Sequence, residues 1–314
     1  MKLKKPKFWD QNKPNLIALL LWPLTIFYSV SNKLRKKNIT HNKEIKTICV
    51  GNIYVGGTGK TSLAIHIKEL LEESNFRVCF IKKYYSDQID EQKILSNQTK
   101  LFCQKKRVES LKEAILAKFD YAIFDDGLQD ESINYDLKLV CFNKLNWVGN
   151  GMLIPAGPMR EKLINIEKYD AIILNGNDEN SENIQKDLKK INSKKIIFNS
   201  TYQPTNINNL KANCNYLAFS GIGNHNTFID MLKINDLNIL KDLEFPDHYK
   251  YSENDLKEII SLSRKLNAKI LTTEKDIIKI DEVYARDMIC IKSRIHIENQ
   301  KKFLNLILMN NENN

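Results

Sequence analysis

Gly56-Gly57-Thr58-Gly59-Lys60-Thr61 is the stretch that decides the fold, because it lies between an apolar, strand-like run at 47–51 and an amphipathic helical pattern at 61–73. Glycines let consecutive backbone N–H groups surround phosphate oxygens, and the N-terminus of the following helix adds a positive dipole. Lys60 can reach the β- and γ-phosphates, and the Thr61 hydroxyl can ligate Mg²⁺. We therefore predict a P-loop whose six residues bind ATP.

One position departs from the usual P-loop pattern. The pattern GxxxxGK[ST] has a glycine five residues before its second glycine, and here that position holds Tyr54. A glycine-rich structural turn is the alternative interpretation. The strand before the loop and the helix after it favour the nucleotide site.

Two consecutive carboxylates, Asp125 and Asp126, follow the apolar run 121–124. Such neighbours repel each other unless a cation lies nearby, and taken alone they would indicate a solvated turn. P-loop folds commonly place an acid at the end of a neighbouring strand to hold the metal or its water. Together with Thr61, this pair therefore predicts a Mg²⁺ site.

Beyond the P-loop the chain alternates between apolar runs and helical patterns. The expected strands are 47–51, 77–81, 121–124, 137–142, 171–174, 196–202, 216–220, 269–272 and 288–292. The expected helices are 61–73, 108–118, 227–233 and 252–266, and a polar stretch at 175–195 separates two of the strands. Repeated βα units predict an α/β fold: a mostly parallel P-loop sheet flanked by helices, with a second, smaller α/β domain. The expected boundaries are an arm at 1–46, a P-loop domain at 47–203 and a C-terminal α/β domain at 204–314.

Composition sets further limits. With 314 residues, 42% apolar and 27% charged, the chain is long enough for two domains and is neither disordered, collagen-like nor a many-span membrane protein. The net charge is +10, but residues 1–46 hold eleven Lys and Arg and only two Asp and Glu. The six cysteines are spread singly without metal-ligand spacing, so we expect reduced core residues.

The basic residues of the arm surround the only long apolar run, 16–30. As a helix this run would be about 22 Å long, short of the ~30 Å hydrocarbon core, so a full crossing is not expected. A signal peptide and a buried core helix are two alternatives. We favour a helix lying in one membrane leaflet, because bases flank the run and Trp22 and Tyr28 suit the interface. Nucleic acid is not the expected partner, since the bases do not line an aromatic groove or a recognition helix.

Seven further segments share an order along the chain with one known family. They are 125–129 (DDGLQ), 149–151 (GNG), 153–161 (LIPAGPMRE), 174–176 (LNG), 219–224 (FSGIGN), 245–248 (FPDH) and 272–276 (TTEKD). On these segments the chain resembles the tetraacyldisaccharide 4'-kinases across nearly its whole length. The resemblance implies transfer of the ATP γ-phosphate, with Mg²⁺, to the 4'-hydroxyl of a tetraacylated glucosamine disaccharide 1-phosphate. The product would be lipid IVA, in lipid A biosynthesis at the cytoplasmic face of the bacterial inner membrane.

The resemblance also implies roles for individual residues. Asp90 would be the catalytic base, His248 would hydrogen-bond to Asp90 and tune it, and Lys60 would act on the transferred phosphate. Glu91 would join the Mg²⁺ shell of Thr61, Asp125 and Asp126. The implied substrate-binding residues are Gln129, Arg160 and Asn175. The flanking residues of the family's Gly-Asp-Glu-Pro segment are absent around Asp90, and its Ser-Arg-Gly-Tyr-Gly segment is replaced by 81–85 (IKKYY), where Lys82 or Lys83 would stand for the arginine.

Structural alternatives exist for several of these residues. Without the family context, Asp90 and Glu91 would be a solvated acidic helix start, His248 a packed loop histidine and Arg160 half of a surface ion pair. A second function also fits the P-loop and the acidic pair: a membrane-recruited P-loop ATPase that works as a switch or assembly factor. The 272–276 segment follows a strand, where α/β loops meet ligands, but its task does not follow from the sequence.

Overall fold

Every residue of strand β4 (Tyr121–Asp125) is buried, and so are five of the six in β1 (Lys46–Gly51). Strands buried on both faces are typical of a parallel sheet that is covered by helices. In the computed structural model, β1 lies between β4 and β5 (Leu137–Asn143) and pairs in parallel with both. The structure describes residues 5–34, 39–176, 181–191, 196–208, 210 and 213–309.

The sheet around β1 has eight strands in the order β12-β7-β6-β5-β1-β4-β2-β3. All strand pairs from β7 to β3 are parallel. The remaining strands of this sheet are β2 (Val78–Lys82), β3 (Leu101–Phe102), β6 (Ala171–Asn175), β7 (Ile196–Pro204) and β12 (Ser293–Ile297). The accompanying helices are η1 (Lys7–Asp10), α1 (Leu16–Leu34), α2 (Lys60–Glu73), α4 (Arg107–Leu116), η2 (Leu163–Lys168), α5 (Ser181–Ile191) and α10 (Gln300–Met309).

A second sheet has four parallel strands in the order β11-β10-β8-β9. Its strands are β8 (Asn215–Ser220), β9 (Asn238–Glu244), β10 (Lys269–Thr273) and β11 (Met288–Ile291). The accompanying helices are α3 (Ile89–Ser96), α6 (His225–Ile234), α7 (Glu253–Lys265), α8 (Glu274–Ile277) and α9 (Glu282–Ala285).

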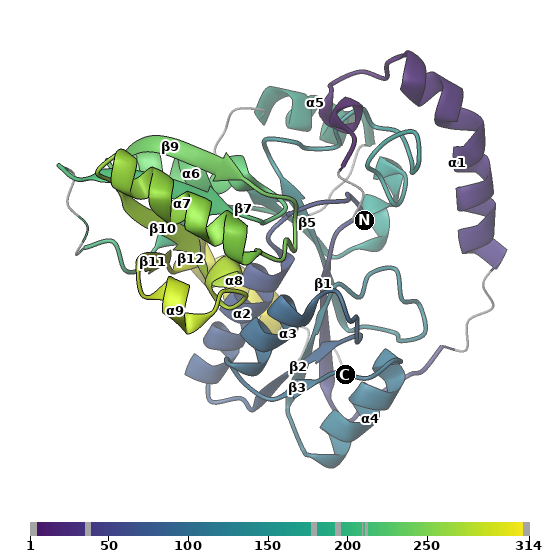
Figure 1. The fold of residues 1–314 in the computed structure, drawn as a ribbon. Coiled ribbons are helices and arrows are strands. Elements are labelled where there is room, and N and C mark those ends of the chain that lie inside the picture. The colour runs from purple at the N-terminus through teal and green to yellow at the C-terminus, as the bar shows by residue number, and fades with distance from the viewer. Residues whose placement is uncertain are drawn as a thin grey trace. The chain divides into compact units, whose positions relative to one another are not determined.

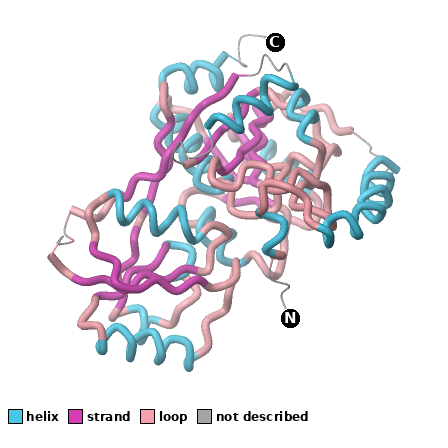
Figure 2. The backbone as a smooth tube through the Cα atoms, turned by 90° about the horizontal axis from the view of Figure 1, so that it is seen from above, coloured by secondary structure: helices cyan, strands magenta, loops and turns pink. Residues whose placement is uncertain are grey.

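Alternate residues of β8 build two separate cores. Tyr216 and Ala218 pack with residues of α6, whereas Leu217 and Phe219 pack with residues of α7. Successive side chains of a strand point to opposite faces, so the two helices cover opposite faces of the sheet. Figure 2 shows the magenta strands of this sheet with helices on both sides.

The chain divides into two compact units, and each is discontinuous. Unit 1 comprises Met1–Tyr84, Thr99–Thr201 and Ile297–Asn314, and unit 2 comprises Tyr85–Gln98 and Tyr202–His296. The short helix α3 therefore belongs to the unit of the four-stranded sheet, although it lies between β2 and β3 in the chain (Figure 1). The predicted fold class, a mostly parallel P-loop sheet flanked by helices with a second α/β region, is confirmed.

The apolar run of the arm forms helix α1, a continuous coil in Figure 1. Leu16, Leu20 and Phe27 expose 73%, 72% and 75% of their surface, so they are not core residues. The described part of α1 buries only Ala18 and Thr25, which disfavours the buried core helix. Among the described residues, no helix is both long and apolar enough to cross a membrane.

Candidate active site

The predicted P-loop connects β1 to α2, and its backbone conformation depends on two glycines. Gly56 has φ +143° and Gly59 has φ +85°, a region that L side chains rarely adopt. Gly59 is the N-cap of α2, so Lys60 is the first helical residue and Thr61 lies buried behind it. Backbone N–H groups and a helix N-terminus thus occur together, as a phosphate site requires.

Two asparagines hydrogen-bond to Thr58 of the P-loop. Asn52 Nδ2 donates to Thr58 Oγ1 over 3.0 Å, and Asn175 Nδ2 donates to the carbonyl oxygen of Thr58. Asn175 is fully buried at the end of β6, and its own oxygen accepts from the Ser200 hydroxyl. Its amide therefore supports the P-loop in this structure, and the predicted role in substrate binding stays a prediction.

The departure at Tyr54 has a structural reason. Tyr54 is 1% exposed, and its hydroxyl donates to Asp10 Oδ1. The ammonium of Lys5 lies 4.5 Å from the centre of the tyrosine ring and forms an ion pair with Asp10. Tyr54 thus ties the nucleotide loop to the start of the chain, a contact that the P-loop pattern does not contain.

The first carboxylate of the acidic pair, Asp125, is completely buried. Its Oδ2 atom accepts from Lys82 Nζ at 2.7 Å and from Thr61 Oγ1 at 3.3 Å. Lys82 is only 1% exposed, so the pair is a buried ion pair. The lysine that would stand for the family arginine therefore lies against the predicted metal ligand.

Asp126, the second carboxylate, lies among cationic side chains. Lys60 Nζ is 3.7 Å and an Arg160 nitrogen 3.2 Å from Asp126 Oδ1, and an Arg107 nitrogen donates to the Asp126 carbonyl over 2.6 Å. Burial would raise the pKa of Asp126, but the charges of Lys60 and Arg160, with others nearby, hold it at about 2. The site gathers positive charge, which suits a polyphosphate ligand.

Arg160 and Gln129 belong to one polar cluster. Arg160 donates to Gln129 Oε1 over 3.2 Å, and Gln129 Nε2 donates to the Asn52 carbonyl over 2.8 Å and to Glu161 over 3.2 Å. The cluster extends from the acidic pair to the loop segment before the P-loop. It joins the predicted phosphate site to two of the predicted substrate-binding residues.

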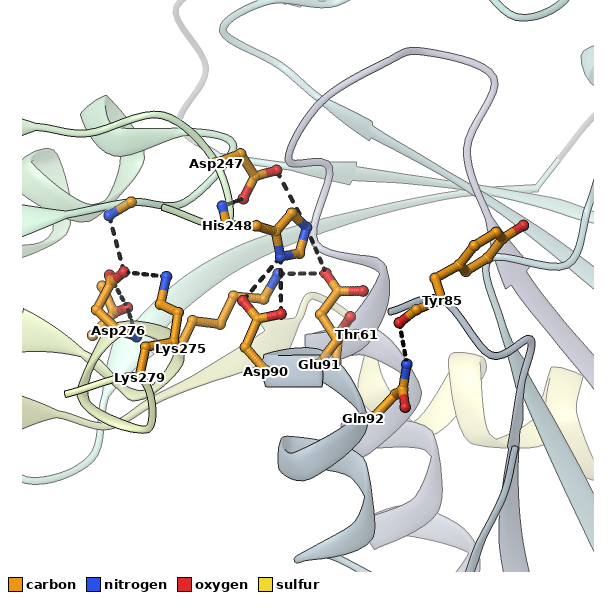
Figure 3. A network of polar contacts seen from close by, with 12 residues as sticks. Thr61, Tyr85, Asp90, Glu91, Gln92, Asp247, His248, Lys275, Asp276 and Lys279 are labelled. Carbon is orange, nitrogen blue, oxygen red and sulfur yellow. Dashed lines mark hydrogen bonds and ion pairs between the residues drawn. The ribbon is translucent and has the colours of Figure 1, made fainter. Parts of the chain in front are cut away.

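The second group of predicted site residues lies in unit 2, where α3 presents two carboxylates to His248 (Figure 3). His248 Nδ1 is 2.9 Å from both carboxylate oxygens of Asp90. An ionised carboxylate only accepts, so the imidazole carries a proton on Nδ1. Asp90 is 6% exposed, which is not the surface of a solvated helix start. Burial would raise the pKa of Asp90, but the hydrogen bond and charge of His248, with the charge of Lys275, hold it below its usual value.

Sequence reasoning missed Lys275. Its ammonium forms an ion pair with Glu91, the carboxylate next to Asp90 (Figure 3). Burial alone would lower the pKa of Lys275, but the charges of Glu91, Asp247 and Asp90 raise it above its usual value. The Mg²⁺-shell role of Glu91 stays a prediction. In this structure a lysine from the 272–276 segment holds that carboxylate.

The buried carboxylate of Asp125 bears on whether a metal ion fits this site. Asp125 Oδ1 is buried and has no hydrogen-bond partner among the residues that the structure describes, so its lone pairs could ligate an incoming cation. No group of three or more His, Cys, Asp or Glu side chains in the described part of the chain is arranged to hold a metal ion by itself. A Mg²⁺ ion here would therefore need further ligands, such as phosphate oxygens and water, which is how this ion is usually bound.

Comparisons with known proteins decide the family. The family model described as Tetraacyldisaccharide-1-P 4'-kinase matches residues 17–311. The chain belongs to the tetraacyldisaccharide 4'-kinase family. It is 51% identical over 314 residues to the tetraacyldisaccharide 4'-kinase of Pelagibacter ubique (strain HTCC1062), with both chains fully covered. It is 33% identical to that of Rickettsia akari (strain Hartford), covering 95% of each chain.

The fold agrees with a solved structure of a tetraacyldisaccharide 4'-kinase. The "apo" form of LpxK from Aquifex aeolicus in complex with ATP superposes with a TM-score of 0.69 at 22% identity, covering 94% of this chain and 99% of that one. The family resemblance predicted from the sequence segments is thus confirmed. Of the site residues, the structure brings Lys60, Thr61, Asp125 and Asp126 together in unit 1, and Asp90, Glu91 and His248 together in unit 2.

Proposed function

We propose that this protein transfers the γ-phosphate of ATP to the 4'-hydroxyl of a tetraacylated glucosamine disaccharide 1-phosphate, forming lipid IVA. The family membership supports the reaction class, and the P-loop geometry supports ATP as the donor. The observation that carries the proposal is the 2.9 Å contact between His248 Nδ1 and Asp90. A carboxylate held by an imidazole suits an enzyme that must accept a proton from a hydroxyl.

The nucleotide half of the mechanism uses the residues of unit 1. Backbone N–H groups of the P-loop and Lys60 would bind the phosphates, and Arg160 would stabilise charge on the transferred group. Thr61, Asp125 and Asp126 would hold Mg²⁺, with Glu91 as a further candidate. When bound, the ion supplies charge neutralisation on the phosphates.

The acceptor half uses Asp90. A sugar hydroxyl is not acidic at neutral pH, so the carboxylate orients it toward the γ-phosphate and accepts its proton as the new P–O bond forms. The bond between the γ-phosphorus and the bridging oxygen breaks at the same time, and ADP leaves. His248 keeps the carboxylate in place through its Nδ1–H. Gln129, Arg160 and Asn175 stand as the proposed substrate-binding residues, and Arg160 and Gln129 already form one cluster.

Variants of Lys60 and Asp90 test this function with labelled ATP and the disaccharide 1-phosphate. Lys60→Ala should lower turnover by about 3–4 kcal/mol of transition-state stabilisation, the usual cost of losing such a clamp. Asp90→Ala should reduce kcat about 10²- to 10⁴-fold while the Kd for ATP changes little. Lys46→Ala, an exchange of a lysine at the start of β1, is the matched control. Normal lipid product from Lys60→Ala would contradict the nucleotide site.

The second candidate function, a membrane-recruited ATPase that acts as a switch, predicts ATP hydrolysis stimulated by a protein and no lipid product. The Asp90–His248 pair favours the kinase, because hydrolysis by a switch needs no side chain that accepts a proton from a sugar. If the label from ATP appeared as free inorganic phosphate and not in a lipid product, the result would support the ATPase switch.

We also propose that the protein works on the cytoplasmic face of the bacterial inner membrane, bound through α1. The exposed apolar side chains of this helix are concentrated in one stretch, and residues 1–46 carry nine of the ten net charges. Each base near an anionic surface adds about 1 kcal/mol to apolar insertion. The partner is then the lipid surface that also holds the acylated substrate.

Flotation with vesicles tests the role of α1. The double variant Leu20→Asp/Phe27→Asp should no longer float with vesicles that contain anionic phospholipid. Both native side chains are exposed on α1 and would insert into the leaflet. The matched control is Leu116→Asp, a residue that is 82% exposed on α4 of the same unit. Equal binding by the double variant and the native protein would contradict this role.

A further inference from the structure

The segment 272–276 (TTEKD) joins strand β10 to helix α8 in unit 2. Thr273 caps the helix: its hydroxyl oxygen accepts from the Asp276 N–H and donates to Asp276 Oδ2 over 2.6 Å. The segment therefore holds the Asp276 carboxylate in one orientation. Asp276 itself is completely buried.

The other oxygen of Asp276 accepts two more hydrogen bonds and forms an ion pair. The Gly221 N–H donates to Asp276 Oδ1 over 3.0 Å, the Tyr251 hydroxyl donates over 2.9 Å, and the Lys279 ammonium lies at 2.8 Å. A buried carboxylate without partners would cost several kcal/mol. These donors satisfy it, and in doing so they attach the loop that contains Gly221 to α8.

Gly221 connects Asp276 to His248 through the backbone. The carbonyl oxygen of Gly221 accepts from the His248 N–H over 3.1 Å. A Cβ at residue 221 would lie 3.1 Å from both the Pro246 carbonyl oxygen and the Tyr251 hydroxyl, so the two loops are in close contact. His248 has φ +57°, which a residue with a side chain adopts only when its surroundings hold it. Asp276 thus fixes the backbone from which the imidazole reaches Asp90.

Lys275 acts on the other member of the pair, Asp90, through the neighbouring Glu91. Its ammonium forms the ion pair with Glu91 Oε1, and Glu91 is adjacent to Asp90 on α3 (Figure 3). Two carboxylates in the first turn of one helix repel each other unless a cation lies between or beside them. Helices α3 and α8 also contact each other within unit 2. Lys275 therefore fastens the acidic end of α3 to the segment that supports His248.

We propose that residues 273–276 are the positioning element of the Asp90–His248 pair: Asp276 holds His248 through Gly221, and Lys275 holds α3 through Glu91. The inference rests on the proposed function, in which Asp90 accepts the proton of the substrate. Neither Lys275 nor Asp276 needs to touch the substrate. Both act by keeping the carboxylate and the imidazole at hydrogen-bonding distance.

Steady-state kinetics of Lys275 variants test the first half. Lys275→Met should lower kcat roughly 10- to 100-fold, a part of what a positioned base contributes, and leave KM for both substrates within about twofold. Lys275→Arg should restore kcat to within about fivefold, because the charge returns. Lys257→Met is the control, since Lys257 forms an exposed ion pair on α7. A folded Lys275→Met protein with native kcat, or an equal loss in the control, would overturn the assignment.

Histidine NMR tests the second half without turnover. In protein labelled with ¹⁵N-histidine, the Nδ1–H signal of His248 is identified by its absence in His248→Gln. Asp276→Asn should shift or broaden this signal, because the backbone of His248 loses its support, while the signals of the other four histidines stay in place. A His248 signal unchanged in a folded Asp276→Asn protein would overturn the inference. Should the protein form no phosphorylated lipid, the proposed function fails in the kinetic assay, and this measurement still decides the positioning role.

Discussion

The buried ion pair of Lys82 and Asp125 gives the sharpest stability prediction. The two charged atoms are 2.7 Å apart, and the side chains are 1% and 0% exposed. At an effective dielectric constant of about 20, the attraction between them is roughly 6 kcal/mol. Lys82→Met keeps an unbranched chain in the core, but of the partners among the described residues it leaves the carboxylate only the Thr61 hydroxyl, at 3.3 Å. Removing one partner of a buried pair typically costs about 3–5 kcal/mol, which is the loss we expect in the free energy of unfolding.

Urea unfolding followed by tryptophan fluorescence reports on the stability of unit 1, which contains the Lys82–Asp125 pair. All three tryptophans, Trp9, Trp22 and Trp147, lie in unit 1, the unit of Lys82. The measurement is made without nucleotide and with a chelator, so that no cation replaces the ammonium. Lys186→Met, which breaks an exposed ion pair on α5, should change stability by less than about 0.5 kcal/mol.

A double variant separates the pair from the packing around it. In Lys82→Met/Asp125→Asn no buried charge is left unpaired, so the double variant should be more stable than Lys82→Met alone by about 1–3 kcal/mol. A loss below about 1 kcal/mol in Lys82→Met, or a double variant that is less stable still, would contradict the stabilising role of the Lys82–Asp125 ion pair.

Three further perturbations have defined outcomes. Burial would raise the pKa of Asp130, but hydrogen bonds from Ser132 and the charge of Arg107 hold it below its usual value. The ionised Asp130 carboxylate therefore stabilises the fold above pH ~4, and this stabilisation is lost as the pH falls through the lowered pKa. Asp130→Asn should lower the free energy of unfolding in urea by about 2 kcal/mol at pH 7 and should not change it below that pKa. Tyr54→Phe removes a buried hydroxyl that bonds to the N-terminal segment, and should lower the melting temperature by an amount equivalent to about 1 kcal/mol without changing circular dichroism. Gly149→Ala should cost more than about 1 kcal/mol in the same assay, since φ is +58° and its Cβ would lie 2.1 Å from a backbone oxygen; a native melting temperature would contradict the close approach.

The strands were the most predictable part of the fold, because a strand buried on both faces is a short, continuous apolar run. The run 121–124 became β4 with one residue added, and 137–142 became β5 with one added. The turn and helix after β1 followed from the glycines and from the helical period at 61–73.

Elements with weak patterns were missed. Helix α5 lies in the stretch 175–195 that was expected only as a polar separator, although Ile184 and Leu188 have helical spacing and pack on the core. Strand β9 was not predicted because it is an exposed edge strand with several charged residues. Few buried side chains mark such elements, and the neighbours that complete them come from elsewhere in the chain.

The site divides in the same way. Lys60, Thr61 and the two aspartates follow local motifs, so their positions at loop and strand ends could be predicted. The partners of these residues could not, because Lys275 is 184 residues from Glu91, and Lys82 is 43 residues from Asp125. One signal was available for Lys82: a lysine at the end of an apolar strand, next to a strand that ends in aspartate.

Because α3 joins unit 2 by packing and not by chain continuity, this unit cannot be obtained by a single cut of the chain. A fragment that starts at Tyr202 contains His248 and the 273–276 segment but lacks the helix that carries Asp90. During synthesis, the 14 residues of Tyr85–Gln98 leave the ribosome more than a hundred residues before the strands that receive them. Asp90, the proposed base, is therefore synthesised long before the rest of its unit, and the Asp90–His248 contact can form only when most of the chain has been made.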